Sequence, residues 1–283
     1  MRVLLAAAIG VLSVVPQQTA LFRSGVRVVP IYASVVGGDG RRLTNLTANE
    51  FTVFDNGVRQ TIAAFDSEPR PLVGVAMWDV SESLTPHRER VRAAAVAFAQ
   101  AMWPGDRFRF GTFGTEVVFS PHLTADKTLL RRIVREEFWF GGPTPLWNTV
   151  EQGLTTIAGE AGERIMVVVS DGDANGVGSR RDLRIDIQRA DIGLYAIGFA
   201  EAGFKNDLRE LADESGGGSA LVKRGADLDA EFKSILGELH SRYLIGFTPA
   251  LLDGLEHKLD VRVSVPGARV RARRSYVAQG PAQ

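Results

Sequence analysis

Short apolar runs alternate with amphipathic segments along the middle of the chain, between residues 71 and 242. The run 165–169 is wholly apolar, which is typical of a strand covered on both faces. Such alternation predicts an α/β fold with a doubly wound, mostly parallel, Rossmann-like sheet and helices on both of its faces. We expect strands at 72–78, 107–113 (with 116–120 returning beside it), 165–169, 192–199 and 219–222, and helices at 87–103, 126–135, 146–158, 181–190, 205–213 and 227–239.

Both flanks of this region have strand-like patterns. In the N-terminal flank, the runs 51–54 and 58–65 surround Asp55-Asn56-Gly57, a strong hairpin signal because Asn and Gly tolerate positive φ angles. The run 26–36 contains Pro30, which indicates an edge or bulged strand. Because neither flank is long enough to form a domain alone, we predict that they pair into one small antiparallel β-domain around the α/β unit. The C-terminal strands are expected at 244–247, 259–265 and 270–277.

The first 20 residues have the pattern of an export signal. Arg2 precedes the uncharged, mostly apolar run 3–15, which is shorter than the roughly 20 residues needed to cross a bilayer. A buried strand or helix, or an uncleaved anchor, is the alternative, and no later stretch is long and apolar enough to span a membrane. We therefore expect an exported protein, periplasmic or secreted, divided into a signal peptide (1–20), an N-terminal β segment (21–70), the α/β domain (71–242) and a C-terminal β segment (243–283).

Composition narrows the chemistry that the chain can perform. It contains no Cys and only four His, which excludes thiolate metal sites and Cys nucleophiles and argues against a His-rich zinc cluster. Its 33 basic and 33 acidic residues balance, whereas proteins that wrap nucleic acid need a basic excess. Oxygen ligands therefore remain as the main candidates for a functional site.

Hydroxyl and carboxylate side chains gather in three loops of the predicted α/β unit. Asp79, Ser81 and Ser83 directly follow the first strand. Thr144 precedes a helix in a Gly-rich loop, and Asp171 follows the most apolar strand. Three hydroxyls and two carboxylates are hard oxygen donors, which Mg²⁺ prefers. For the first loop alone, a helix N-cap cluster is the alternative interpretation.

These three loops resemble the metal-ion-dependent adhesion site of the von Willebrand factor type A domain family, which has an Asp-x-Ser-x-Ser motif, a Thr in a Gly-rich loop and a third loop with Asp before Gly. The resemblance covers residues 71–242. One departure from the pattern is Pro143, which separates the Gly pair from Thr144 and stiffens that loop. The resemblance implies that Mg²⁺ (or Mn²⁺) is bound by Ser81, Ser83 and Thr144, with Asp79 and Asp171 acting directly or through water.

A narrower resemblance extends over nearly the whole chain that follows the expected signal. It is to exported bacterial proteins of the same family that are common in acidobacteria. It rests on the segment 46–57 (LTANEFTVFDNG), on the strand-like segment 243–249 (YLIGFTP) and on the basic final strand 269–276.

The predicted site favours a protein-binding module over an enzyme. An Mg²⁺ held in this way keeps an open position, for which an Asp or Glu of a protein partner is the natural ligand. The alternatives are a metal-assisted hydrolase, with Asp171 and Asp173 near the ion, and a structural metal site without ligand capture. Against the hydrolase, no motif places a general base, and the sequence contains neither a Walker-type phosphate loop nor a Gly-x-Ser-x-Gly elbow.

Overall fold

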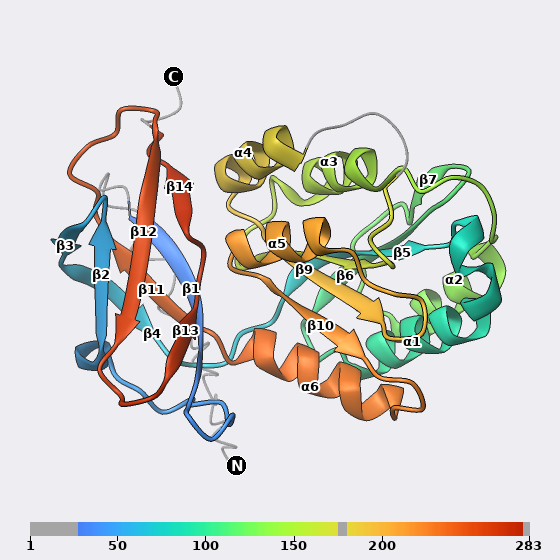
Figure 1. Ribbon diagram of the computed structural model, residues 1–283, viewed down its shortest axis with the longest axis horizontal. Helices are drawn as coiled ribbons and strands as arrows, with labels where there is room; N and C mark the ends of the chain where they lie inside the picture. Colours follow the sequence, from blue (N-terminus) through green and yellow to red (C-terminus); the bar gives the residue numbers. More distant parts are fainter. Residues whose placement is uncertain (1–27, 175–179, 280–283) are drawn as a thin grey trace, which may run out of the picture.

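The larger of two domains is built on a six-stranded sheet. Its strands are β5 (Val73–Asp79), β6 (Arg107–Phe113), β7 (Val117–Phe119), β8 (Arg164–Val169), β9 (Gly193–Phe199) and β10 (Gly218–Val222). They lie in the order β10-β9-β8-β5-β6-β7, and all are parallel except β7, which returns antiparallel to β6. The computed structural model describes residues 28–174 and 180–279, and Figure 1 shows this sheet beside a smaller β-domain.

Helices cover both faces of this sheet (Figure 1). Buried side chains of one group pack together on one face, and those of a second group pack on the other. The predicted α/β fold with a doubly wound, mostly parallel sheet is confirmed, and the helix bounds differ from the expected ones by one or two residues. The first group is α1 (Arg88–Ala101), α2 (Lys127–Glu137) and α6 (Leu228–His240), and the second is α3 (Leu146–Ile157), α4 (Arg180–Ala190) and α5 (Asn206–Glu214).

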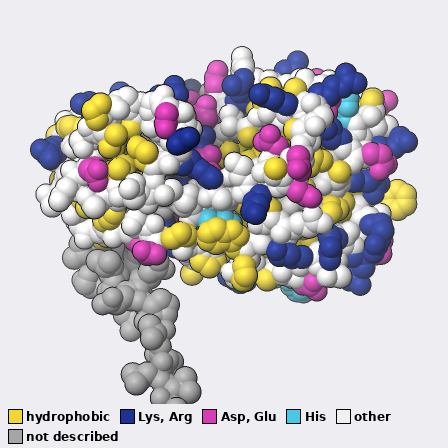
Figure 2. Space-filling view, turned by 90° about the horizontal axis from the view of Figure 1, so that it is seen from below, with side chains coloured by type: hydrophobic (Ala, Val, Ile, Leu, Met, Phe, Trp, Pro, Cys, Tyr) yellow, Lys and Arg dark blue, Asp and Glu magenta, His cyan; other side chains and the backbone are white. Residues whose placement is uncertain are grey.

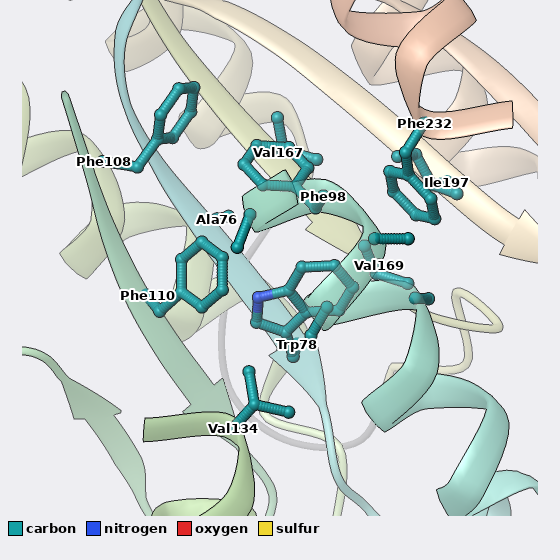
Figure 3. Packing of buried hydrophobic residues seen from close by; sticks show 14 of the residues in the cluster. Ala76, Trp78, Phe98, Phe108, Phe110, Val134, Val167, Val169, Ile197 and Phe232 are labelled. Atoms are coloured by element: carbon teal, nitrogen blue, oxygen red, sulfur yellow. The ribbon is translucent and has the colours of Figure 1, made fainter. Parts of the chain in front are cut away.

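Trp78 lies at the centre of the core beneath α1, α2 and α6 (Figure 3). Its indole packs edge-on against Phe98, with the ring centroids 6.0 Å apart, and tilted against Phe110 and Phe232 at 5.7 Å and 6.2 Å. The side chain is fully buried. Because Asp79 follows directly in the chain, this packing fixes the carboxyl end of β5.

The two flanks pair into two four-stranded antiparallel sheets of the β-domain. One sheet has the order β13-β1-β11-β4 and the other β14-β12-β2-β3, so strands of the two flanks are neighbours in both. The predicted antiparallel β-domain built from both flanks is therefore confirmed. Its strands are β1 (Val29–Val36), β2 (Phe51–Asp55), β3 (Val58–Gln60), β4 (Ile62–Asp66), β11 (Tyr243–Phe247), β12 (Glu256–Val263), β13 (Arg269–Arg271) and β14 (Ser275–Val277).

The predicted hairpin is present between β2 and β3. Asn56 and Gly57 have φ angles of 48° and 82°, the left-handed conformation that the tight turn requires. Pro30 does not place β1 at a sheet edge, because β1 lies between β11 and β13. However, pairing with β13 begins only at Ser34, and the Pro30 carbonyl accepts a hydrogen bond from the Arg273 side chain instead. The missing N–H therefore leaves no strand partner unsatisfied.

Two expected strands are each divided between the two sheets. The run 58–65 forms β3 and β4, and the run 270–277 forms β13 and β14. In the second case the chain bends toward the α/β domain. The Arg274 N–H donates to the Glu214 carbonyl at 3.1 Å, and the Arg273 guanidinium pairs with Asp191 at 2.6 Å. These contacts interrupt the strand, so its two halves pair in different sheets.

A buried ion pair lies at the amino end of the parallel sheet, where the α/β domain meets the β-domain. Arg242 contacts Glu163 at 3.0 Å, and the exposed fractions of the two side chains are only 4% and 2%. Arg242 also donates to the Tyr32 carbonyl of β1 at 2.8 Å. Beside it, the Arg70 N–H donates to the His240 carbonyl at 3.2 Å, so the chain enters and leaves the α/β domain at neighbouring points. The domain boundaries at 70/71 and 242/243 stay a prediction, and the expected signal at 1–20 lies outside the described residues.

Acidic and basic side chains are interspersed on the face of the molecule seen in Figure 2. Within residues 28–174 and 180–279, no helix combines the length and apolar character needed to cross a membrane.

Candidate metal centre

Asp79 ends β5, and both of its carboxylate oxygens accept hydrogen bonds. The Ser81 N–H donates to Oδ1 at 2.9 Å, and the Ser170 hydroxyl donates to Oδ2 at 2.5 Å. Asp79 and Ser170 are fully buried. Ser170 reaches Asp79 because β5 and β8 are adjacent parallel strands whose carboxyl ends meet at the same edge of the sheet.

Ser81, Ser83 and Asp171 form a continuous chain of contacts. The hydroxyl oxygens of Ser81 and Ser83 are 3.1 Å apart, and the Ser83 hydroxyl donates to Asp171 Oδ2 at 2.8 Å. Ser81 and Asp171 are buried, whereas Ser83 is exposed. The structure therefore brings four of the five predicted residues together, with one of them open to solvent.

Ser81 is also the N-cap residue of a short 3-10 helix, η3 (Glu82–His87). An N-cap role would direct its hydroxyl to a backbone N–H of that helix. No such side-chain bond is formed, and the hydroxyl contacts Ser83 instead. Helix capping therefore does not explain why a hydroxyl is placed at Ser81.

Thr144 lies in the loop before α3, and this loop is bound to the Asp79 loop through the backbone. The Gly141 N–H donates to the Val80 carbonyl at 2.7 Å, and the Glu82 N–H donates to the Gly142 carbonyl at 3.0 Å. Thr144 is buried, but its side chain makes no hydrogen bond to the other four predicted residues in the described part of the chain. The Thr144 loop and the Asp79 loop are therefore adjacent, but the Thr144 side chain forms no hydrogen bond with the candidate ligands of the Asp79 loop.

Gly142 allows this loop to approach the neighbouring one closely. Its φ is +83°, and a Cβ atom at this position would lie 2.4 Å from the Thr115 hydroxyl oxygen. Any other residue would be strained there and would displace Thr115. Pro143, the departure from the family pattern, is exposed, and the backbone bonds of the two glycines that precede it are present.

The pKa of Asp79 is raised to about 6, chiefly by burial and to a smaller extent by the nearby negative charge of Asp171. Hydrogen bonds from Ser170 and Ser81 act in the opposite direction but do not cancel the effect of burial. Among the described residues, no Lys, Arg or His forms an ion pair with either carboxylate. Within the described ranges, the two acidic groups therefore share one buried corner without an ion-pair partner.

A hard divalent cation fits this set of donors. The donors are carboxylate and hydroxyl oxygens, which Mg²⁺ and Mn²⁺ accept, and the uncompensated carboxylates supply negative charge. The described residues contain no group of three or more His, Cys, Asp or Glu side chains suited to a metal. A cation at this corner would therefore depend on the hydroxyl groups for part of its coordination.

Ser170 is a contact that the sequence interpretation did not assign. It precedes Asp171, donates from its hydroxyl to Asp79, and accepts the Gly172 N–H at 2.9 Å. The sequence feature that could have identified Ser170 is its hydroxyl group, which directly follows the most apolar strand. Asp173, by contrast, is exposed, and only its backbone N–H contacts the site, at Asp171 Oδ1.

The fold and the site together define a class of protein: α/β domains with an oxygen-donor corner at the carboxyl edge of the sheet. The chain belongs to the von Willebrand factor type A domain family, whose model matches residues 75–237, more than half of the sequence. A comparison with curated proteins gives no match.

Solved structures are similar to this chain at low identity. Proximal thread matrix protein 1 from the mussel byssus is 13% identical with a TM-score of 0.50, and the alignment covers 75% of this chain and 50% of that one. The vWF domain of the pili tip protein Mfa5 from Porphyromonas gingivalis is 14% identical (TM-score 0.46, covering 60% and 95%). Manganese-loaded TRAP protein from Plasmodium vivax is 10% identical (TM-score 0.48, covering 79% and 98%). This chain thus spans about half of the mussel protein, and the similarity concerns the fold alone.

Proposed function

We propose that the chain is an extracytoplasmic protein-binding module, serving adhesion or assembly, that captures an Asp or Glu of a protein partner through a divalent cation. The observation that carries this proposal is the hydrogen-bonded chain from Asp79 to Asp171 through two serines, with no cationic side chain on either carboxylate among the described residues. The cation is Mg²⁺ or Mn²⁺, held by Ser81, Ser83 and Thr144, with the two carboxylates acting directly or through water.

The chemistry of the donors indicates the kind of partner. Hydroxyl ligands are neutral, so they leave a divalent cation electron-poor, and a bound cation supplies an electrophilic position that attracts an anion. Ser83 is the exposed member of the set, which is the side from which a partner carboxylate can approach. A carboxylate from outside supplies the charge that the neutral hydroxyls lack.

We infer binding rather than catalysis from the surroundings of the site. Among the described residues, the groups hydrogen-bonded to Asp79, Ser83 and Asp171 are serine hydroxyls and backbone N–H groups, and none is a His or Glu suited to act as a general base. A hydrolase would have to use Asp171 itself for that task. The mixed charge of the surface in Figure 2 likewise favours a protein over a nucleic acid as the partner.

The extracytoplasmic location rests on sequence features. The segment 1–20 has the pattern of an export signal, whether it is cleaved or retained as an anchor. The segments 46–57 and 243–249 are similar to those of exported acidobacterial proteins of this family. Fractionation of the producing cells, with N-terminal sequencing of the recovered protein, tests this part: a cytoplasmic product that retains Met1 in soluble form would contradict it.

Metal titration tests the site directly. Calorimetric titration with Mg²⁺ and with Mn²⁺ is expected to show one site in the wild-type chain and none in Asp79→Ala or Thr144→Ala. Asp173→Ala is the matched control, because Asp173 is a neighbouring exposed carboxylate that touches the site only through its backbone. A wild-type chain that binds neither ion refutes the metal site.

Partner capture is tested by a pulldown from the source organism in Mg²⁺ and in EDTA. The proposal expects specific proteins to be retained only with metal, and only by variants that still bind it. Retention that persists in EDTA contradicts it. Turnover of a phosphoester or peptide that is lost in Asp171→Ala would favour the hydrolase, and a closed coordination shell in a metal-bound crystal structure would favour a structural metal.

A further inference from the structure

Trp139 is the most exposed large apolar side chain among the described residues. Its exposed fraction is 80%, although Trp is usually well buried in folded proteins. It lies between α2 and α3, in the segment that also carries Thr144. Trp is the residue type most enriched among the side chains that dominate protein–protein binding energy.

The neighbours of Trp139 hold it in this outward position. Phe138 is buried, with its ring centroid 6.3 Å from that of Trp78 in the core. Phe140 is half-buried against the same core, and the guanidinium of Arg92 lies 5.5 Å from its ring centroid. Arg92 also donates to the Phe138 carbonyl at 2.5 Å. With both neighbours anchored, the backbone at Trp139 is fixed and its indole faces solvent.

The segment that carries Trp139 leads directly into the loops of the candidate metal centre. Two residues further along, the Gly141 N–H donates to the Val80 carbonyl, directly after Asp79. Between Trp139 and α3 the segment also carries the exposed Pro143, and Trp147 of α3 is half-buried against the core. An exposed aromatic side chain in the segment that leads to a cation-binding corner matches the aromatic enrichment of protein interfaces.

We propose that Trp139 is a specificity-determining contact of the partner, packing against an apolar side chain that lies a few residues from the carboxylate held by the cation. The partner segment is therefore an acidic residue with a large apolar neighbour at a fixed spacing, rather than an acidic residue alone. This inference rests on the proposed function, because it assumes that the cation holds the carboxylate.

A displayed library of random heptapeptides tests this inference without a known partner. Selections are made in Mg²⁺ on the full wild-type chain, on Trp139→Ser and on Leu255→Ser. Leu255 is a matched control, since it is 64% exposed and lies in the β-domain. The most enriched peptide is then synthesised, and its affinity is measured for each variant together with the affinity for Mg²⁺.

The wild type and Leu255→Ser are expected to enrich an acidic residue with a large apolar residue at one spacing, and Trp139→Ser to keep the acidic preference and lose the apolar one. The selected peptide should bind Trp139→Ser at least tenfold more weakly, with Mg²⁺ affinity unchanged. Enrichment of acidic residues with no apolar preference in the wild type overturns the inference and leaves the proposed function standing. Peptides without an acidic residue, or binding that survives EDTA, overturn the proposed function instead.

Discussion

The Ser83 hydroxyl donates a 2.8 Å hydrogen bond to the Asp171 carboxylate, across 88 residues of sequence. Through Ser81 and the backbone, the same contacts lead to Asp79. The loops after β5 and β8 are therefore held together by their own side chains. The same oxygens are the candidate donors to a cation, so these hydrogen bonds position the donors of the site.

Asp79→Asn should separate the stability of the site from its function. The amide keeps the shape of the carboxylate and removes a buried charge that has no ion-pair partner in the described part of the chain. In EDTA at pH 7 we expect the melting temperature of the variant to equal or exceed that of the wild type, while the rise on adding Mg²⁺ disappears. Differential scanning calorimetry with and without Mg²⁺ measures both. A variant that is less stable in EDTA and still stabilised by Mg²⁺ would contradict the assignment of Asp79.

The stability of the metal-free chain should depend on pH through Asp79. Its pKa is raised to about 6, so between about pH 4 and 6 the folded chain holds a proton that the unfolded chain has lost. Stability from this group therefore falls as pH rises through that window and is constant above it. The difference in unfolding free energy between Asp79→Asn and the wild type should grow by up to about 3 kcal/mol from pH 4 to 7. Urea unfolding in EDTA at several pH values measures it, and a flat difference would refute the expectation.

Ser170→Ala should weaken metal binding although Ser170 was not among the predicted ligands. The substitution removes the hydroxyl that orients Asp79 Oδ2 and leaves the backbone of the loop in place. Loss of such an orienting contact commonly costs 10- to 100-fold in metal affinity. Titration with Mn²⁺, followed by electron paramagnetic resonance, measures the change. An unaltered affinity for Mn²⁺ would mean that the hydrogen bond from Ser170 is not needed to orient Asp79.

Arg242→Met should destabilise the whole chain by about 3–5 kcal/mol, because it leaves Glu163 buried without its partner. Burial already raises the pKa of Glu163, and the positive charge of Arg242 is the main influence that opposes this. The double variant Arg242→Met with Glu163→Gln should recover part of the loss, since no uncompensated charge then remains. Urea unfolding of the single and double variants decides the matter: equal stability of the two would show that the ion pair does not set the cost.

The alternation of apolar runs and helical faces was sufficient to predict the α/β domain. The spacing of apolar residues follows from the geometry of a single helix or strand. The strand that became β8 and the helix that became α3 were therefore expected almost to the residue. The division of the final strand into β13 and β14 was not predictable in this way. It results from Arg273 and Arg274 contacting Asp191 and Glu214, residues of the other domain that no local pattern connects to them.

The candidate site was partly accessible from sequence for a similar reason. Asp79 ends β5, while Ser83 and Asp171 lie in the segments that follow β5 and β8. Adjacent parallel strands bring these segments together, and the structure shows a direct contact between Ser83 and Asp171. The role of Ser170 depends on which oxygen of Asp79 faces β8, and sequence spacing does not contain that information. All five residues remain predictions as metal ligands. For Thr144, backbone bonds alone place its loop beside the Asp79 loop.

The hydrogen bond between the Arg70 N–H and the His240 carbonyl places the two ends of the α/β domain side by side. A domain whose two ends lie close together can be removed from the surrounding chain, or replaced, without separating the parts that flank it. Joining residue 70 to residue 241 through a short turn would keep β4 and β11, the strands that border the junction, paired in their present register. Another domain whose ends lie equally close together could be inserted at the same position. The close spacing of these two ends would therefore allow the α/β domain to be replaced while the β-domain is kept.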